Sequence, residues 1–184
     1  MIICGIDPDT THTAVAFGTK HQLKAVYIIE VPRKPGQKPK IDMIREIGIV
    51  LPGLLRIWQP KVLVVEGQAI HHKGKAPPAD ILSIAQVAGA AAGCNGVGSA
   101  LLIPEPHEWK GSVPKPIHQM RTYRAFGLAA EQRSDYAYPL PSSALNTIHG
   151  ANELSQSDWK HVGDAAGMVL WGAKQAVALE AEAP

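Results

Sequence analysis

Three acidic residues far apart in the chain are the first candidates for chemistry. Asp7 ends the apolar run MIICGI, and Glu66 ends the run VLVVE. Asp164 lies in the stretch HVGDAAG, three residues after His161. A buried carboxylate is costly unless it faces a backbone N–H, a basic side chain or a metal ion. Asp7 alone could simply cap a turn, but two acids at the ends of strands that could be neighbours begin to indicate a site.

Apolar runs predict the strands that carry the first two acids. Residues 1–6 indicate a short buried strand, and residues 13–18 a second strand after a polar turn. The turn GTKH then leads into a third strand over residues 22–31. Residues 61–68 are rich in β-branched residues, which is typical of a central strand covered on both faces. Residues 99–103 predict a fifth strand.

Helical periodicity predicts the remaining elements. The periodic segments are residues 41–58, 79–94 and 117–132, and a last helix that Ser157 or Asp158 can cap. Residues 134–155 have many turn formers and no clear period, so we assign them no structure; they could be a lid, a partner surface or a mobile loop. An antiparallel triplet continued by helical crossovers predicts a five-stranded mixed sheet with helices on both faces. Asp7 and Glu66 would then lie at the same end of adjacent strands, and the last helix would bring Asp164 toward them.

Composition bounds the class of protein. A chain of 184 residues with 46% hydrophobic and 18% charged residues is long enough for one well-buried domain and short for two. No apolar run reaches membrane-spanning length and no signal-peptide pattern begins the chain, so we expect a cytoplasmic protein with no membrane partner. Cys4 and Cys94 are far apart and form no CxxC motif, which suggests neither a disulfide framework nor a structural zinc site.

Local basic clusters are more informative than the formal net charge of +2. Residues 32–40 carry four cations and no acid, Lys73 and Lys75 follow Glu66, and Lys110 and Lys115 occupy another expected loop. Each cluster taken singly is most simply a solvated loop. Gathered on one face, they would attract the phosphate backbone of a nucleic acid. The four lysines are therefore candidate DNA contacts.

The three acidic motifs resemble those of a known family. GIDPDTTHTAVA, VLVVEGQ and HVGDAAGMVLWG are similar to the motifs of the RuvC-like Holliday junction resolvases, in the ribonuclease H-like superfamily. The resemblance spans nearly the whole chain and implies one nuclease domain over residues 1–184. It further implies a homodimer that cleaves four-way junctions or other branched DNA in recombination and repair. Lys110 and Lys115 resemble the lysines with which the family contacts DNA.

The resemblance also implies a metal site. Asp7, Glu66 and Asp164 would ligate Mg²⁺, for which Mn²⁺ would substitute, and His161 matches a position that holds either His or Asp among relatives. Two Mg²⁺ ions about 4 Å apart can activate water, stabilise charge at phosphorus and help the leaving oxygen. His161 could ligate an ion or handle a proton. Alternatively, it is a helix-end histidine packed against the sheet.

Departures from the family pattern affect the predicted substrate. Asp9 stands where relatives commonly have Gly, as either an outer-shell acid or a turn residue. The loop AIHHKGKAPP lacks the aromatic residue that cellular members insert at the junction centre, and Ile70, His71 and His72 could replace it. This divergence resembles phage-encoded relatives, which accept a wider range of branched DNA.

Two other functions compete with the nuclease. GIDPDTT also resembles the first phosphate loop of actin-like sugar kinases, but that fold needs two such domains and a second phosphate loop. A non-catalytic nucleic-acid-binding module with a ribonuclease H-like fold is the stronger alternative. It does not account for three carboxylates, since a DNA binder gains nothing from acids that face phosphate.

Overall fold

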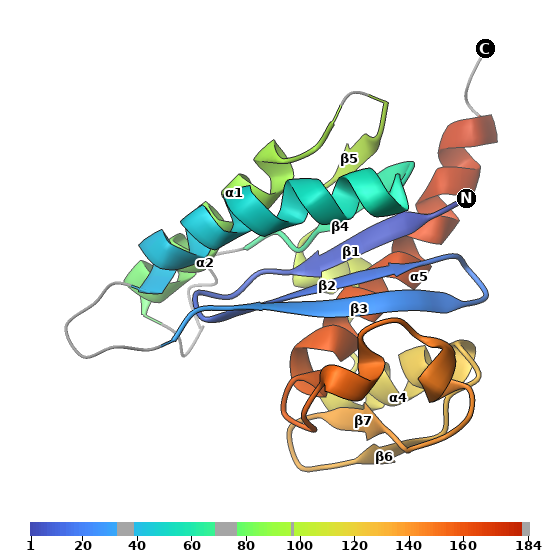
Figure 1. Cartoon of the computed structure of the whole chain (residues 1–184). Helices are drawn as coiled ribbons and strands as arrows, with labels where there is room; N and C mark the ends of the chain where they lie inside the picture. The colour runs from blue at the N-terminus through green and yellow to red at the C-terminus, as the bar shows by residue number, and fades with distance from the viewer. Residues whose placement is uncertain (33–38, 69–76, 97, 182–184) are drawn as a thin grey trace.

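A five-stranded mixed sheet forms the centre of the molecule (Figure 1). The computed structural model describes residues 1–32, 39–68, 77–96 and 98–181. The strands are β1 (Ile3–Asp7), β2 (His12–Gly18), β3 (Leu23–Glu30), β4 (Val62–Val65) and β5 (Ala100–Leu102), in the order β3-β2-β1-β4-β5. The first three pair antiparallel, and β4 pairs parallel with both β1 and β5. The predicted strand set and its mixed topology are confirmed.

The register of β1 and β4 places the first two acids side by side. Ile6 is opposite Val65 in the parallel pair. The backbone N–H of Glu66 donates to the carbonyl of Ile6 at 3.0 Å, which extends this pairing by one residue. Asp7 and Glu66 therefore follow at the same end of neighbouring strands, because parallel strands end at the same edge of a sheet.

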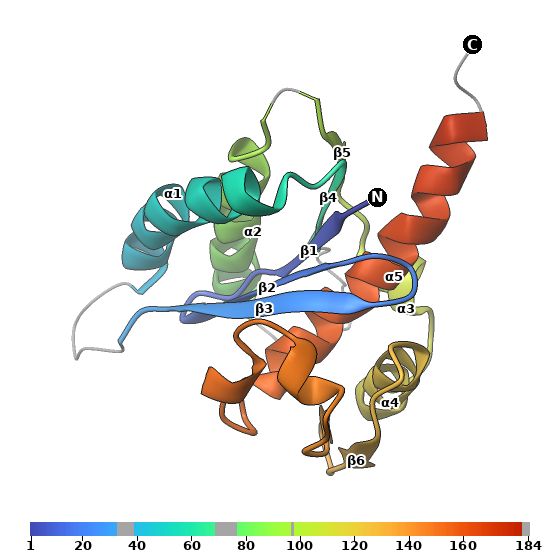
Figure 2. The ribbon, with the colours of Figure 1, turned by 45° about the vertical axis from the view of Figure 1, so that its right-hand side comes forward.

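Helices cover both faces of the sheet, as predicted (Figures 1 and 2). α1 (Pro39–Trp58) and α2 (Pro78–Gly93) pack together on one face, where Met43, Ile47 and Val87 enter the core. α5 (Trp159–Ala181) lies along the other face against β1 and β2. α3 (Pro106–Lys110) and α4 (Lys115–Ala125) pack on α5.

The segment between β5 and α5 differs most from the prediction. The helix expected over residues 117–132 begins at Lys115 and ends at Ala125, because Gly127 takes a left-handed φ of 74° and closes the helix. β6 (Ala130–Gln132) and β7 (Ala137–Pro139) then form a hairpin. A short helix, α3, replaces part of the expected loop, so the prediction that Lys110 and Lys115 lie in a loop was wrong: Lys110 ends α3 and Lys115 begins α4.

The stretch left without structure, residues 134–155, covers the edge of the sheet. It contains β7 and the single turns η1 (Leu145–Thr147) and η2 (Ala151–Glu153). His149 exchanges backbone hydrogen bonds with Val26 and Lys24 of the edge strand β3, each at 2.9 Å. An unpaired edge strand is a site for unwanted strand addition, so this segment protects the sheet as well as extending the fold.

The structure also bears on membrane-spanning helices and on the two cysteines. Across the described ranges, no helix combines the length and apolar character needed to cross a membrane. Cys4 and Cys94 are both free thiols, the first buried and the second half-buried.

Candidate active site

The three predicted acids come together at one end of the sheet. Asp7 ends β1, Glu66 follows β4, and Asp164 lies near the start of α5. Their exposed fractions are only 7%, 6% and 2%. Gly5 allows α5 to approach β1 this closely, because a Cβ on Gly5 would lie 2.1 Å from the carbonyl oxygen of Ala165.

Asp7 is the carboxylate held in its charged form. Nδ1 of His161 lies 3.2 Å from Oδ2 of Asp7. Burial alone would raise the pKa of Asp7, but hydrogen bonding with His161 and the positive charges of Lys115 and His161 outweigh burial and lower it. The ring of His12 lies parallel to that of His161, with centroids 6.1 Å apart. His161 is thus a partner of Asp7 inside the cluster and does not merely pack against the sheet.

Glu66 is held in its neutral form. Burial, followed by the nearby charge of Asp7, raises the pKa of Glu66 to about 8. Hydrogen bonding between these two carboxyl groups raises the pKa of Glu66 further and lowers that of Asp7. Nζ of Lys110 is 3.6 Å from Oε1 of Glu66 and offsets only part of this effect. Burial and the neighbouring Asp7 therefore disfavour a second charged carboxylate beside Asp7 in the absence of a further cation.

Asp164 has partners on both of its oxygens. Nζ of Lys115 lies 2.6 Å from Oδ2, and Nε2 of Gln119 donates to Oδ1 at 2.9 Å. Burial nevertheless raises the pKa of Asp164, because it outweighs the effect of Lys115. Although burial by itself lowers the pKa of Lys115, the surrounding carboxylates raise it, Asp164 first among them.

Gln119 is the residue of the site that sequence reasoning missed. It is fully buried on α4, one helical turn after Lys115, so the two side chains share a face. The available signal was this spacing of four from a candidate lysine. That spacing does not reveal which element the shared face contacts, because the partner of a helix face is decided by tertiary packing.

The donor set suits a hard divalent cation, but the side chains are not preassembled around one. Among the described residues, no three His, Cys, Asp or Glu side chains already converge as a metal-binding group. Lys110 and Lys115 lie against two of the carboxylates instead. Carboxylate oxygens are the ligands that Mg²⁺ and Mn²⁺ prefer, and burial, followed by the charge of Asp7, raises the pKa of Glu66. By chemistry the cluster fits such an ion once the lysines move aside.

The remaining sequence candidates are basic residues, the possible wedge residues and Asp9. Lys73, Lys75 and the possible wedge residues 70–72 fall outside the described residues, as does most of the basic stretch 32–40. Asp9 is a turn residue: its Oδ1 accepts hydrogen bonds from the N–H of Thr11 at 2.8 Å and the hydroxyl of Thr11 at 3.0 Å.

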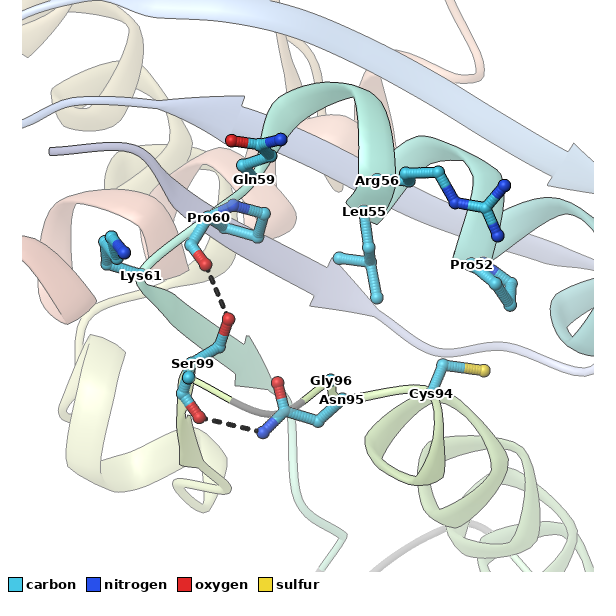
Figure 3. A pocket seen from close by; sticks show the side chains of 11 residues that line it. Pro52, Leu55, Arg56, Gln59, Pro60, Lys61, Cys94, Asn95, Gly96 and Ser99 are labelled. Carbon is cyan, nitrogen blue, oxygen red and sulfur yellow. Dashed lines mark hydrogen bonds between the residues drawn. The ribbon is translucent and has the colours of Figure 1, made fainter.

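A hollow at the opposite end of β4 does not have the composition of a metal site (Figure 3). Arg56, Lys61 and Cys94 line it, and none of its lining residues in the described part of the chain carries a carboxylate. The hydroxyl of Ser99 donates to the carbonyl of Pro60 at 2.6 Å and joins the two loops that border the hollow.

Comparison with known proteins identifies the fold. No protein-family model matches the chain, and a search of the curated proteins finds no match. Among solved structures, RuvC of Thermus thermophilus in complex with a Holliday junction substrate matches with a TM-score of 0.60 and 18% identity, over 97% of this chain and 96% of that one. The chain has the RuvC fold.

Two further structures agree with this assignment. A second structure of Thermus thermophilus RuvC matches with a TM-score of 0.58 and 19% identity, over 97% of this chain and 96% of that one. The yeast mitochondrial Holliday junction resolvase Ydc2 matches with a TM-score of 0.54 and 12% identity, over 97% and 83% of the two chains. The ribonuclease H-like fold predicted from the sequence motifs is confirmed.

Proposed function

We propose that this chain is a metal-dependent, structure-selective endodeoxyribonuclease that cleaves four-way junctions or other branched DNA. The observation that carries the proposal is the cluster of Asp7, Glu66 and Asp164, buried together at one end of a RuvC-fold sheet. Ydc2 is a Holliday junction resolvase, and one RuvC structure holds a junction substrate, which supports branched DNA as the substrate class.

In this proposal, residues 1–184 are one nuclease domain and the three carboxylates hold Mg²⁺ together with His161. Two bound ions would supply Lewis acidity and an activated water for phosphodiester hydrolysis. The chain's own residues orient these ligands: His161 holds Oδ2 of Asp7, and Gln119 holds Oδ1 of Asp164. Burial of the carboxylates excludes competing water and strengthens their attraction for a cation.

Lys110 and Lys115 have two roles in this proposal. Without metal they lie against the carboxyl groups of Glu66 and Asp164. With a metal ion held by the carboxylates, both ammonium groups would be available to contact DNA phosphates. Lys73 and Lys75 would extend this cationic surface.

The proposal also covers the oligomeric state and the cellular location of the enzyme. A homodimer would place two sites on opposed strands of a symmetric junction and give paired nicks. The apolar side chains exposed on α1 and α2, including Ile49, Ile57 and Leu82, support these helices as the dimer surface. A cytoplasmic location is supported by the two free cysteines, and a phage origin stays a prediction.

Cleavage of labelled DNA tests the function directly. A four-way junction, a flap, a three-way fork and a linear duplex are incubated with Mg²⁺, Mn²⁺ or EDTA, using wild type and Asp7→Asn. We expect metal-dependent cutting by wild type and at least a hundredfold loss in Asp7→Asn, an estimate on the scale of electrostatic catalytic contributions. Junction binding should be retained.

Asp9→Asn is the matched control, because it makes the same acid-to-amide change in the same turn and keeps the oxygen that Thr11 contacts. It should cut like wild type. Paired nicks confined to the four-way junction indicate a resolvase, and cutting of all branched forms indicates a broader debranching nuclease. Junction binding without any Asp7-dependent cutting would establish the non-catalytic binding module instead.

A further inference from the structure

Gln119 forms a complete hydrogen-bond network inside the protein. Its side chain is 0% exposed. Nε2 donates to the carbonyl of Lys160 at 2.7 Å and to Oδ1 of Asp164 at 2.9 Å. Oε1 accepts from the N–H of Ala137, on β7, at 2.8 Å. One amide thus joins α4, α5 and the β6–β7 hairpin.

The partners allow this amide only one orientation. A flipped side chain would turn its NH₂ group toward the N–H of Ala137 and its oxygen toward the oxygens of Lys160 and Asp164. That arrangement loses all three hydrogen bonds in a buried environment, where an unpaired polar group costs about 1–3 kcal/mol. The backbone of β7 therefore decides that an N–H donor, and not an oxygen, faces Asp164.

The fixed amide also orients the carboxylate of Asp164. Gln119 donates a hydrogen bond to Oδ1, and Oδ2 is the oxygen that faces Lys115. Against burial, Asp164 and then Asp7 raise the pKa of Lys115, whose Nζ lies 2.6 Å from Oδ2, so Oδ2 shares its cation with the acidic cluster. A carboxylate held in this way has one oxygen reserved for the protein and one available to a cation.

The close approach that makes this contact possible depends on Gly163. A Cβ at this position would lie 2.9 Å from Cγ and 3.0 Å from Cδ of Gln119. Gly163 immediately precedes Asp164, so the helix surface is open just where Gln119 reaches across.

We propose that Gln119 is a positioning residue for metal binding, and that the β6–β7 hairpin holds it in place through Ala137. The inference rests on the proposed function and deepens it, because it assigns a role to the hairpin. Gln119 touches neither substrate nor metal; it acts by presenting Oδ2 of Asp164 to the cluster. Outer partners of this kind contribute about 10- to 100-fold to metal affinity or activity.

The competing explanation is purely structural: Gln119 would only stabilise the packing of α4 on α5. Tyr123 provides a matched control for that role. It is buried one turn further along α4, and its hydroxyl donates to the carbonyl of Trp159 on α5 at 2.8 Å. Tyr123→Phe removes a buried hydrogen bond across the same helix pair without touching Asp164.

The test compares Mn²⁺ affinity, measured by electron paramagnetic resonance, in wild type, Gln119→Met and Tyr123→Phe, together with melting temperature and the kcat and KM for branched DNA. We expect Gln119→Met to weaken Mn²⁺ binding about 10- to 100-fold and to lower kcat while KM stays near wild type. Tyr123→Phe should lower the melting temperature but leave Mn²⁺ affinity within about twofold, since it leaves the Asp164 contacts intact.

Several outcomes overturn the inference. Wild-type Mn²⁺ affinity in Gln119→Met, or an equal loss in Tyr123→Phe, would reduce Gln119 to a structural residue while the proposed nuclease function stands. Wild type that neither binds Mn²⁺ nor cuts DNA would defeat the proposed function itself. If Gln119→Met does not fold, the side-chain amide signal of Gln119 in the nuclear magnetic resonance spectrum of wild type is followed during addition of Mg²⁺; an unchanged signal overturns the inference.

Discussion

At the scale of single residues, the candidate site is a set of buried carboxylates balanced by lysines. The sequence predicts the three acids as metal ligands, and Lys110 and Lys115 as DNA contacts. In the structure, Lys110 pairs with Glu66 and Lys115 pairs with Asp164. Breaking a buried pair is costly because it leaves one charge uncompensated. The lysines therefore belong to the energetics of the metal-free protein as well as to any DNA contact.

Lys115→Met should destabilise the metal-free protein and should be rescued by metal. Removal of the ammonium leaves Asp164 buried without its ion partner, at a cost of about 3 kcal/mol in the free energy of unfolding. A bound cation replaces the lost charge, so Mn²⁺ should recover much of this stability. Urea unfolding in EDTA and in Mn²⁺ measures both effects.

Lys160→Met is the matched control for this experiment. Its ammonium lies 3.6 Å from Asp135 in an exposed pair, and such pairs contribute under about 1 kcal/mol. Equal losses in the two variants, or no Mn²⁺ rescue of Lys115→Met, would contradict the account of the acidic cluster.

His118 should make the protein less stable in mild acid. Burial, followed by the charges of Lys110 and Arg121, lowers the pKa of His118 to about 4, while an unfolded histidine has a pKa of about 6.5. Between these values the unfolded chain binds a proton that the folded chain does not. The contribution of His118 is thus fully present above pH 6.5 and is lost as the pH falls toward 4, by about 2 kcal/mol.

Urea unfolding of His118→Phe in EDTA between pH 4 and 7 checks this prediction. Phe keeps an aromatic ring against Trp109, whose ring centroid lies 4.9 Å from that of His118. The variant should lose less stability than wild type over this window. His21→Phe, at an exposed position, should behave like wild type, and parallel curves for His118→Phe and wild type would show that His118 does not titrate as described.

At the scale of elements, glycines on α5 decide how closely the neighbouring helices approach. Gly163 faces Gln119 and Tyr123 of α4, and Gly167 faces His118 of α4 and Trp109 of α3. Positions four apart in a helix share a face, so the two glycines form one contact surface for α3 and α4. This surface brings Lys110, Lys115 and Gln119 to the acids.

Gly167→Ala should therefore destabilise the protein by about 1–3 kcal/mol, the usual cost of overpacking. The added Cβ would lie 2.7 Å from Cε1 of His118 and 2.8 Å from Cζ3 of Trp109, so α3 and α4 must shift.

Gly89→Ala is the opposite case: Gly89 lies on α2, and no atom lies within 4 Å of an added Cβ. Helix propensity should make Gly89→Ala more stable by about 0.5–1 kcal/mol. Thermal unfolding of both variants measures these changes in stability. A Gly167→Ala variant as stable as wild type would refute tight packing at this surface.

At the scale of the whole molecule, the fold gathers the candidate chemistry at one end of the sheet and leaves apolar residues exposed on α1 and α2. Ile57 is 73% exposed, and Leu82 on the neighbouring helix is 57% exposed. α1 and α2 pack against each other, and their exposed apolar residues make this pair of helices a candidate interaction surface. A dimer through this surface would leave the acidic cluster free for DNA.

Leu82→Glu should convert the proposed dimer to monomers and replace paired nicks with single ones, because it buries a charge in the interface. Analytical ultracentrifugation and nicking of a circular cruciform substrate measure the two effects. Val177→Glu, on α5, changes a similarly exposed residue outside this surface, 58% exposed, and should stay dimeric. A wild-type monomer, or a dimeric Leu82→Glu, would remove this surface from the proposal.

The sequence by itself determined the five-stranded mixed sheet and the placement of Asp7 and Glu66 at neighbouring strand ends. Both follow from local patterns: apolar runs, turn residues and the rule that parallel strands end together. The periodic stripe of α5 likewise placed Asp164 toward the sheet. Each strand and helix could be predicted because it depends on residues close together in the chain, and general rules of sheet topology then joined the strand ends.

Only the tertiary structure decided the end of α4, the β6–β7 hairpin and the partners of the acids. The periodic apolar pattern predicts a helix that continues past Ala125. Periodicity alone does not show that Gly127 adopts a left-handed conformation, which ends the helix. The pairing of Lys115 and Gln119 with Asp164 joins residues more than forty positions apart. It depends on how closely α4 approaches α5, which is set by packing at Gly163 and by the backbone of β7, and no local pattern encodes that distance.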